Sequence, residues 1–218
     1  MSPYCPSRKS VNIYLSLCTC WWIIAFIFVG THQPVEIFRP LNIHISDSVD
    51  TLMMWWTQMG EGIFIAIMGI MVIVLRKDFR KLPVILLIAL MLTLPSLVTN
   101  IVKSLADAPR PLTLFGATDW IHWVEGYKNN FHRSWPSGHT TGAFSVFFVL
   151  TYALKDSSRW WAVLFFFCAL MTGFSRIQLS QHFFEDILAG SIIGTAVPYF
   201  LAYGFQFVKW GRSHPETK

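Results

Sequence analysis

Two residues late in the chain, His182 and Asp186, have the types and spacing for nucleophilic or acid–base chemistry. They are four positions apart, which on a helix stacks two side chains one turn apart. The carboxylate can then hold one imidazole nitrogen as a donor, and the other nitrogen is free to act as a nucleophile or a base. Such pairs are common and often only structural. Their chemistry therefore depends on the side chains that meet them.

A second histidine closes the sequence Pro136-Ser137-Gly138-His139, which suits the start of a helix. Ser137 can cap the helix, and Gly138 lets a ligand approach the backbone. The free N–H groups of a helix start attract anions. Ordinary capping with a surface histidine explains the same four residues. An anion site with an adjacent acid or base is the alternative.

Three permanent cations complete the set of candidate residues. Lys103 and Arg110 are seven positions apart, so a continuous helix would place them on one face. Pro109 and Pro111 indicate instead that the helix ends near them. Either way, two cations point outward from one helix end, although snorkelling to a membrane interface would explain Lys103 alone. Arg176 adds the third cation.

The combination of clusters is more informative than any one of them. Three cations, two histidines, one carboxylate and a helix N-terminus in a low-dielectric site need a multiply charged anion to offset their desolvation. Phosphate meets this need, because each of its oxygens can meet a cation or an N–H donor. The sequence offers no carboxylate cluster for Mg²⁺. We therefore expect metal-free chemistry without a cofactor.

The elements that must position these clusters are apolar. Hydrophobic types make up 54% of the 218 residues and charged types only 13%, about half the charged share of a soluble domain. One small core could not enclose so much apolar surface. The net charge of +5 lies in short clusters between apolar runs, which argues against a nucleic-acid partner. We expect one integral membrane domain over residues 1–218.

Six apolar runs approach the length of about 20 residues that crosses a bilayer. They cover residues 11–29, 62–75, 82–102, 137–154, 160–174 and 187–208. Because the runs are continuous rather than alternating, they predict an all-α bundle of six transmembrane helices. The second is expected to recruit residues upstream of Glu61, and Pro95 predicts a kink in the third. Residues 45–60 fit either an interfacial helix or a loop against the bundle.

The positions of Lys and Arg predict the orientation. With the N-terminus in the cytoplasm, the short inner segments carry most of the 17 basic residues, as in other membrane proteins. The first run is long for a signal peptide and is interpreted as an uncleaved span. Both termini are then cytoplasmic. All three polar clusters lie at the outer helix ends, on the side away from the cytoplasm.

Together, the clusters resemble the signature of the type 2 phosphatidic acid phosphatase superfamily of membrane lipid phosphatases. That signature is Lys-x6-Arg-Pro, then Pro-Ser-Gly-His, then Ser-Arg-x5-His-x3-Asp. This chain has every position, namely Lys103, Arg110, Pro111, Pro136, Ser137, Gly138, His139, Ser175, Arg176, His182 and Asp186. The resemblance covers about residues 45–208. The first 44 residues and residues 112–135 carry no motif of the family.

The resemblance implies a mechanism that agrees with the residue types. His182 would attack phosphorus and form a phosphohistidine, and Asp186 would orient it. His139 would protonate the leaving oxygen and then act as the base for the hydrolytic water. The phosphate would be bound by Lys103, Arg110, Ser137, Gly138 and Arg176.

The expected function is hydrolysis of a phosphate monoester or pyrophosphate of a membrane lipid at the periplasmic face. Lipid A is the favoured substrate, because residues 112–135 offer aromatic and basic groups that suit a sugar-bearing anionic headgroup. These are Trp120, His122, Trp123, Tyr127, Lys128, His132 and Arg133. An ordinary interfacial aromatic belt is the alternative explanation of these residues.

Other substrates and one other class of protein stay open at this point. Undecaprenyl pyrophosphate, phosphatidylglycerol phosphate and phosphatidic acid are the alternative lipids. A non-catalytic membrane protein that binds lipid phosphates is the alternative class. The two histidines and Asp186 argue against it, because binding alone would need only the cations.

Overall fold

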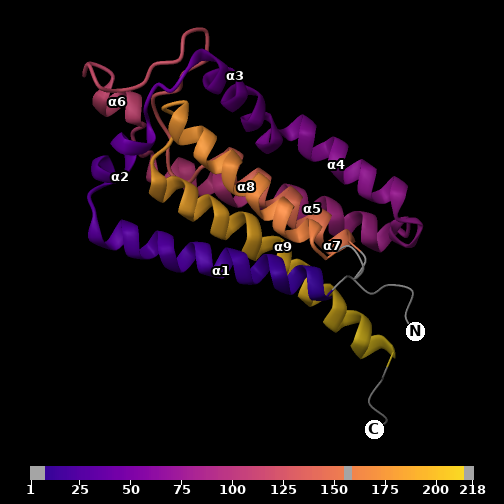
Figure 1. The fold of residues 1–218 in the computed structure, drawn as a ribbon. Helices are drawn as coiled ribbons and strands as arrows, with labels where there is room; N and C mark the ends of the chain where they lie inside the picture. Colours follow the sequence, from indigo (N-terminus) through magenta and orange to yellow (C-terminus); the bar gives the residue numbers. More distant parts are fainter. Residues whose placement is uncertain (1–7, 155–158, 214–218) are drawn as a thin grey trace.

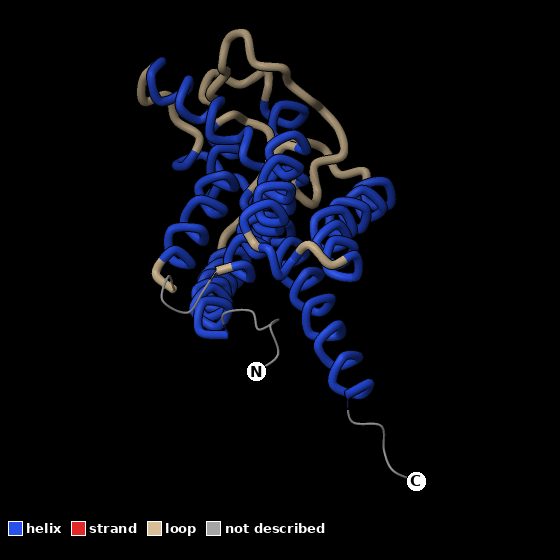
Figure 2. The backbone as a smooth tube through the Cα atoms, turned by 90° about the vertical axis from the view of Figure 1, so that its right-hand side faces the viewer, coloured by secondary structure: helices blue, strands red, loops and turns tan. Residues whose placement is uncertain are grey.

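The computed structural model describes residues 8–154 and 159–213, and every regular element in them is helical (Figure 1, Figure 2). Among these residues, four helices contain segments long and apolar enough to cross a membrane. They are α1 (Arg8–Thr31), α5 (Leu82–Ala106), α8 (Trp161–Gln178) and α9 (Phe184–Ser213). The all-α prediction is confirmed.

The outward surfaces of these helices are apolar. Large side chains such as Ile27 of α1, Leu86 of α5 and Phe200 of α9 are more than half exposed. Water-soluble proteins rarely expose apolar side chains over such long stretches, whereas lipid-facing helices require them. The chain is a multi-pass membrane protein.

A fifth candidate span is broken into two parts. Helix α3 (Asp47–Trp56) runs into the 3-10 helix η1 (Thr57–Gly60), and α4 (Gly62–Leu75) follows after a bend of 55°. Helix α4 itself begins at Gly62, so residues upstream of Glu61 extend the second apolar run only where the bent pair counts as one span. Residues 45–60, for which a helix or a loop was expected, are mainly helical.

The expected fourth span is helix α7 (Gly138–Ala153), which has only 16 residues. It lies at the centre of the bundle and packs against α1, α4, α5, α8 and α9. Its side chains from Thr140 to Tyr152 are all buried. An apolar run enclosed on all sides satisfies a protein core as well as a bilayer, so its composition alone does not make it a span. The described residues therefore contain up to five candidate spans, and the sixth stays a prediction.

The short elements are divided between the two ends of the bundle. Helices α2 (Pro34–Leu41) and α6 (Pro111–Phe115) and the loop at residues 116–137 gather at one end, where α5 and α8 finish and α9 begins (Figure 1). The 3-10 helix η2 (Lys77–Phe79) connects α4 to α5 at the other end. The three polar clusters consequently share the first end.

The lysine and arginine of the first cluster do not share a helix. Helix α5 continues through Pro95 and ends at Ala106, after which Asp107 adopts a left-handed conformation with φ of 38°. Arg110 is the N-cap of the following helix α6. The prolines therefore end the helix that carries Lys103, as one of the two alternatives predicted.

Two glycines allow the segments at this end to approach closely. A Cβ atom at Gly190 of α9 would lie 2.7 Å from the carbonyl oxygen of Ser137. A Cβ atom at Gly60 would overlap the backbone of His139. The absence of a side chain at these positions brings α9 against the start of α7 and places Glu61 next to His139.

Candidate active site

One cavity of about 330 Å³ collects most of the predicted site residues. It lies at the end of the bundle where the polar clusters meet. The predicted residues that line it are Lys103, Arg110, Gly138, His139, Arg176 and His182. Asn100, Asn130, His132 and Arg133 complete the lining. Three distant stretches of the chain, at residues 100–110, 130–139 and 176–182, thus converge on one small polar space.

His182 and Asp186 are in contact, and both are buried. Nδ1 of His182 lies 3.0 Å from Oδ2 of Asp186. His182 precedes the start of α9, so the pair does not lie on one continuous helix as expected. The backbone N–H of Phe183 and the hydroxyl of Ser134 donate to the same oxygen, at 3.0 and 2.5 Å. With Nδ1 engaged in this way, Nε2 is the imidazole nitrogen left for a substrate.

The surroundings of His182 favour its neutral form. Burial lowers the pKa of His182 well below the ordinary value of 6.5, and the positive charges of Arg110, Lys103 and Arg176 lower it further. A neutral imidazole has a free lone pair, which a nucleophile requires.

Lys103 and Arg110 are held by carbonyl oxygens. Nζ of Lys103 donates to the backbone carbonyl of Arg133 at 2.7 Å. Arg110 donates from Nε to the carbonyl of His132 at 2.9 Å, and from Nη1 to the carbonyl of Gln181 at 3.1 Å. Because these acceptors are neutral, they orient the cations without cancelling their charge. The positive field in the cavity remains available to an anion.

Arg176 is only 2% exposed and has the most enclosed position of the three cations. Its Nη1 donates to the hydroxyl of Thr57 at 2.9 Å and to that of Tyr127 at 2.5 Å. The guanidinium carbon lies 5.8 Å from the centre of the Tyr127 ring. Its buried Nε has no hydrogen-bond partner within the described parts of the chain. An unmade bond of this kind is unfavourable, and the oxygen of a bound anion would satisfy it.

His139 has an acidic partner that no motif contains. Its Nε2 lies 2.6 Å from Oε1 of Glu61, the residue at the bend before α4. The side chain of Glu61 is half exposed, whereas that of His139 is 23% exposed. A carboxylate at this distance fixes the orientation of the imidazole ring.

Ser137 and Gly138 have separate roles. The hydroxyl of Ser137 accepts hydrogen bonds from the N–H and the hydroxyl of Thr140, at 3.4 and 2.9 Å, and so caps α7. Ser137 is absent from the residues that line the cavity, whereas Gly138 is among them. The arrangement therefore matches the capping alternative for Ser137. A role in phosphate binding stays a prediction for both Ser137 and Gly138.

The loop at residues 116–137 contributes less directly than expected. Of its predicted headgroup residues, His132 and Arg133 line the cavity. Tyr127 instead supports the buried arginine. His122 is buried, and its Nε2 lies 2.9 Å from Oδ1 of Asp50.

Sequence analysis missed several supporting residues. They are Thr57, Glu61, Ser134 and Gln181. A signal existed for Glu61, since it lies between two glycines that interrupt an apolar run. Ser134 stands just before the Pro136 motif but has no spacing rule of its own. Contacts of this type depend on tertiary packing and not on local pattern.

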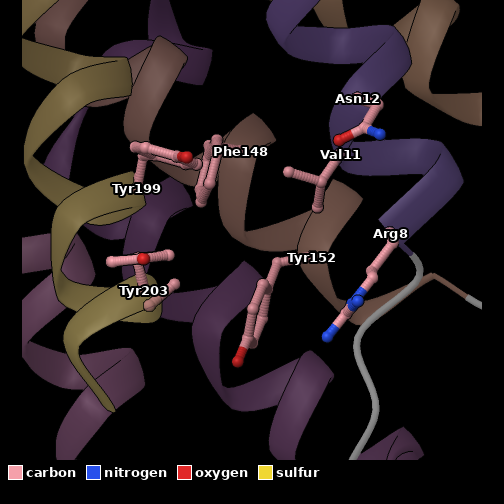
Figure 3. A pocket seen from close by; sticks show the side chains of 8 residues that line it. Arg8, Val11, Asn12, Phe148, Tyr152, Tyr199 and Tyr203 are labelled. Atoms are coloured by element: carbon pink, nitrogen blue, oxygen red, sulfur yellow. The ribbon is translucent and has the colours of Figure 1, made fainter. Parts of the chain in front are cut away.

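Two further hollows differ in chemistry from the polar cavity. One of about 550 Å³ adjoins Asp186 and is lined mainly by apolar groups, including Phe115, Trp135 and Phe183. The other, of about 280 Å³, lies between α1, α7 and α9 at the opposite end (Figure 3). Its lining residues include Arg8 but neither a histidine nor a carboxylate. It therefore lacks the groups needed for phosphoryl transfer.

Sequence comparisons match the chain to one protein family and to curated phosphatases. The PAP2 superfamily profile matches residues 84–210. A lipid A 1-phosphatase from Porphyromonas gingivalis is 36% identical over 65 residues, a match that spans 30% of this chain and only 15% of that relative. An undecaprenyl-diphosphatase from Sulfolobus acidocaldarius is 23% identical over 197 residues, which cover 82% of this chain and 88% of the relative.

Solved structures show the same fold. Aquifex aeolicus LpxE superposes with a TM-score of 0.65 at 22% identity, covering 80% of this chain and 98% of that one. The first transmembrane PAP2 type phosphatidylglycerolphosphate phosphatase from Bacillus subtilis gives a TM-score of 0.62 at 21% identity, with coverages of 88% and 94%. At these identities the likeness concerns the fold alone.

Proposed function

Because the chain belongs to the PAP2 superfamily of membrane phosphatases, which act on lipid phosphates, we propose that it removes a phosphate from a lipid through a phosphohistidine formed on His182. The observation that carries this proposal is the convergence of two histidines and three cations on one cavity. A phosphoryl group there could reach His182, His139 and the unpartnered Nε of Arg176.

The first step forms the covalent intermediate. Nε2 of His182 attacks phosphorus, and the bond between phosphorus and the lipid oxygen breaks. His139 gives its proton to that leaving oxygen. The contact of 3.0 Å with Asp186 stabilises the positive imidazole that develops on His182. Lys103, Arg110 and Arg176 balance the charge on the phosphoryl oxygens.

The second step releases phosphate. Neutral His139 takes a proton from a water molecule, whose oxygen attacks phosphorus. The bond from phosphorus to His182 breaks, and inorganic phosphate leaves. Both histidines return to their initial states, so no redox partner or cofactor is required. All the charge stabilisation in this scheme comes from side chains and backbone N–H groups.

A lipid substrate is supported by the apolar hollow beside the catalytic pair. Its lining residues Phe115, Trp135 and Phe183 adjoin Asp186, so an acyl or isoprenoid chain could lie there while its phosphate occupies the polar cavity. The apolar lining would favour such a chain over a soluble phosphate ester.

For the substrate, we favour lipid A. His132 and Arg133 line the cavity and suit an anionic sugar headgroup. The similarity to a lipid A 1-phosphatase points the same way. Undecaprenyl diphosphate is the second candidate, because the match to an undecaprenyl-diphosphatase extends over most of both chains.

The placement in the membrane is part of the same proposal. We infer that residues 1–218 form a single lipid phosphatase domain with six spans, α7 being the sixth. Both termini would lie in the cytoplasm and the polar cavity would face the periplasm of a bacterial inner membrane, since basic residues concentrate on the other side. A cysteine introduced at exposed Lys128 should then react with an impermeant maleimide in intact spheroplasts.

The substrate is tested by comparing phosphate release from four purified lipids in detergent. These are lipid A, undecaprenyl diphosphate, phosphatidylglycerol phosphate and phosphatidic acid. We expect the highest kcat/KM with lipid A and no release by His182→Gln. A higher kcat/KM with undecaprenyl diphosphate would assign the second candidate. Absence of release from all four would contradict the catalytic proposal.

A further inference from the structure

A cluster of metal-binding side chains lies outside the catalytic cavity. His44, Asp50 and His122 each present one ligand atom, and these atoms all lie within 4.8 Å of one another. None of the three lines the cavity. We propose that this cluster binds one divalent transition-metal ion, for which Zn²⁺ is the best fit. No metal site was predicted from the sequence, which led only to the expectation of metal-free chemistry.

The spacing of the three side chains is close to that of a metal site. Oδ1 of Asp50 lies 2.9 Å from Nε2 of His122, and Oδ2 lies 3.3 Å from Nδ1 of His44. In tetrahedral zinc sites, neighbouring nitrogen and oxygen ligands are about 3.4 Å apart. Small side-chain rotations would therefore admit an ion among atoms that are already assembled.

The surrounding residues hold the cluster in position. The side chain of Asn42 accepts a hydrogen bond from the N–H of His122 at 2.9 Å, and Ser180 donates to the carbonyl of His122 at 2.5 Å. The other ring nitrogen of His44 lies 3.8 Å from Oδ1 of Asp47. This distance is too long for a hydrogen bond, so Asp47 adds negative charge near the His44 ring without fixing it.

Two of the three candidate ligands are buried and the third is half exposed, which suits a metal ion that enters from solvent. The side chains of His122 and Asp50 are 7% and 9% exposed, so two ligands are largely shielded from water. That of His44 is 54% exposed, which provides an entry path and room for a water molecule. Three protein ligands and one water form a common coordination sphere of zinc.

The ligand types select the ion. Two imidazole nitrogens and one carboxylate suit Zn²⁺ and similar ions, whereas Mg²⁺ and Ca²⁺ prefer sets made of oxygen alone. His44 lies between α2 and α3, Asp50 is in α3, and His122 is in the loop at residues 116–137. A bound ion would therefore fasten this loop to α3. The same loop carries Tyr127, which supports Arg176, so the ion would stabilise the cavity wall without taking part in the reaction.

The test is metal binding by the full-length protein, purified in detergent with a tag that contains no histidine. After EDTA treatment and removal of the chelator, the protein is titrated with Co²⁺, whose visible absorption reports its ligands. We expect about one Co²⁺ per chain, displaced by Zn²⁺ but not by Mg²⁺. Zn²⁺ should also raise the melting temperature. Absence of a saturable Co²⁺ signal would overturn the proposal.

Variants locate the ion. His44→Gln removes a half-exposed ligand with little risk to folding and should weaken binding by about 10-fold or more. Asp50→Asn should also weaken ion binding. If this variant fails to fold, binding by His44→Gln alone tests the assignment. His32→Gln, on an exposed residue, and His139→Gln, in the catalytic cavity, are matched controls that should retain the ion. Wild-type binding by His44→Gln, or loss of binding in His139→Gln, would contradict the assignment.

Discussion

Oε1 of Glu61 lies 2.6 Å from Nε2 of His139, although the two residues belong to different helical segments. The contact follows from the fold, because Gly60 packs directly against the backbone of His139. A carboxylate so close fixes the ring and opposes the burial and the Arg176 charge, both of which disfavour the protonated imidazole. In the proposed mechanism this is the form that gives a proton to the leaving oxygen. Glu61 is therefore a positioning residue that acts through His139.

We predict that Glu61→Gln lowers kcat by about 10-fold or more, a part of the roughly 10²–10⁴-fold that acid–base catalysis supplies. KM should change little, since Glu61 does not line the phosphate cavity. Glu61→Asp, which keeps the charge, should recover part of the rate. The control is Glu125→Gln, on an exposed loop residue. Equal rates for Glu61→Gln and Glu125→Gln would refute the role.

Replacement of His182 tests the covalent step. We expect His182→Gln to lose hydrolysis by at least about 10³-fold, because the nucleophile is gone. Glutamine keeps a polar group next to Asp186, so the melting temperature should stay near that of the wild type. Wild-type protein quenched during turnover with a ³²P-labelled substrate should carry acid-labile, alkali-stable phosphate, and the variant should not. Near-normal turnover in a folded variant would exclude His182 as the nucleophile.

Motif spacing predicted most of the charged residues that line the cavity. Lys103, Arg176 and His182 were each named from sequence, and all three line it. These motifs can be recognised in the sequence because each lies at the end of an apolar run. The topology of the helices then places all of them at one end of the bundle. The hydroxyl of Ser137 caps α7, and its predicted role in phosphate binding stays a prediction, since capping and anion binding use the same residue type.

The supporting contacts could not be predicted in this way. Ser134 reaches Asp186 from a loop, and Thr57 reaches Arg176 from a 3-10 helix. Neither contact has a local period or a fixed spacing, so only the packed structure reveals it. The same holds for α7, whose apolar run fits a bilayer and a protein interior equally well.

Removal of metal ions should affect the melting temperature of the protein but not its catalytic turnover. The residues that line the cavity include no carboxylate to bind Mg²⁺, so we expect turnover below the melting temperature to survive EDTA and not to rise with added Mg²⁺. Loss of an ion from the cluster around Asp50 should lower only the melting temperature. His44→Gln should behave like wild-type protein treated with EDTA. A strict requirement for Mg²⁺ would contradict the proposed mechanism.

The pH profile should report the environment of His182. Burial, with the charges of Arg110 and Lys103, lowers the pKa of His182 well below 6.5. A lowered pKa means that the imidazole stays neutral as the pH falls through 6.5 and becomes protonated only in more acidic solution. Activity limited by this group should therefore persist below pH 6.5 and then decline, as measured by kcat/KM, which reports the free enzyme.

Removing one of the charges that lower this pKa should move the acid limb in a known direction. Lys103→Gln deletes a positive charge that disfavours protonation of His182, so the pKa of His182 should rise. The acid limb of kcat/KM should shift to higher pH, in addition to any loss of phosphate binding. Any titration of the substrate affects the wild type and the variant equally, because both are assayed with the same lipid. The difference between their acid limbs therefore reports the enzyme. Lys128→Gln, an exposed change in the nearby loop, should leave the limb in place, and an unmoved limb in Lys103→Gln would show that His182 does not control it.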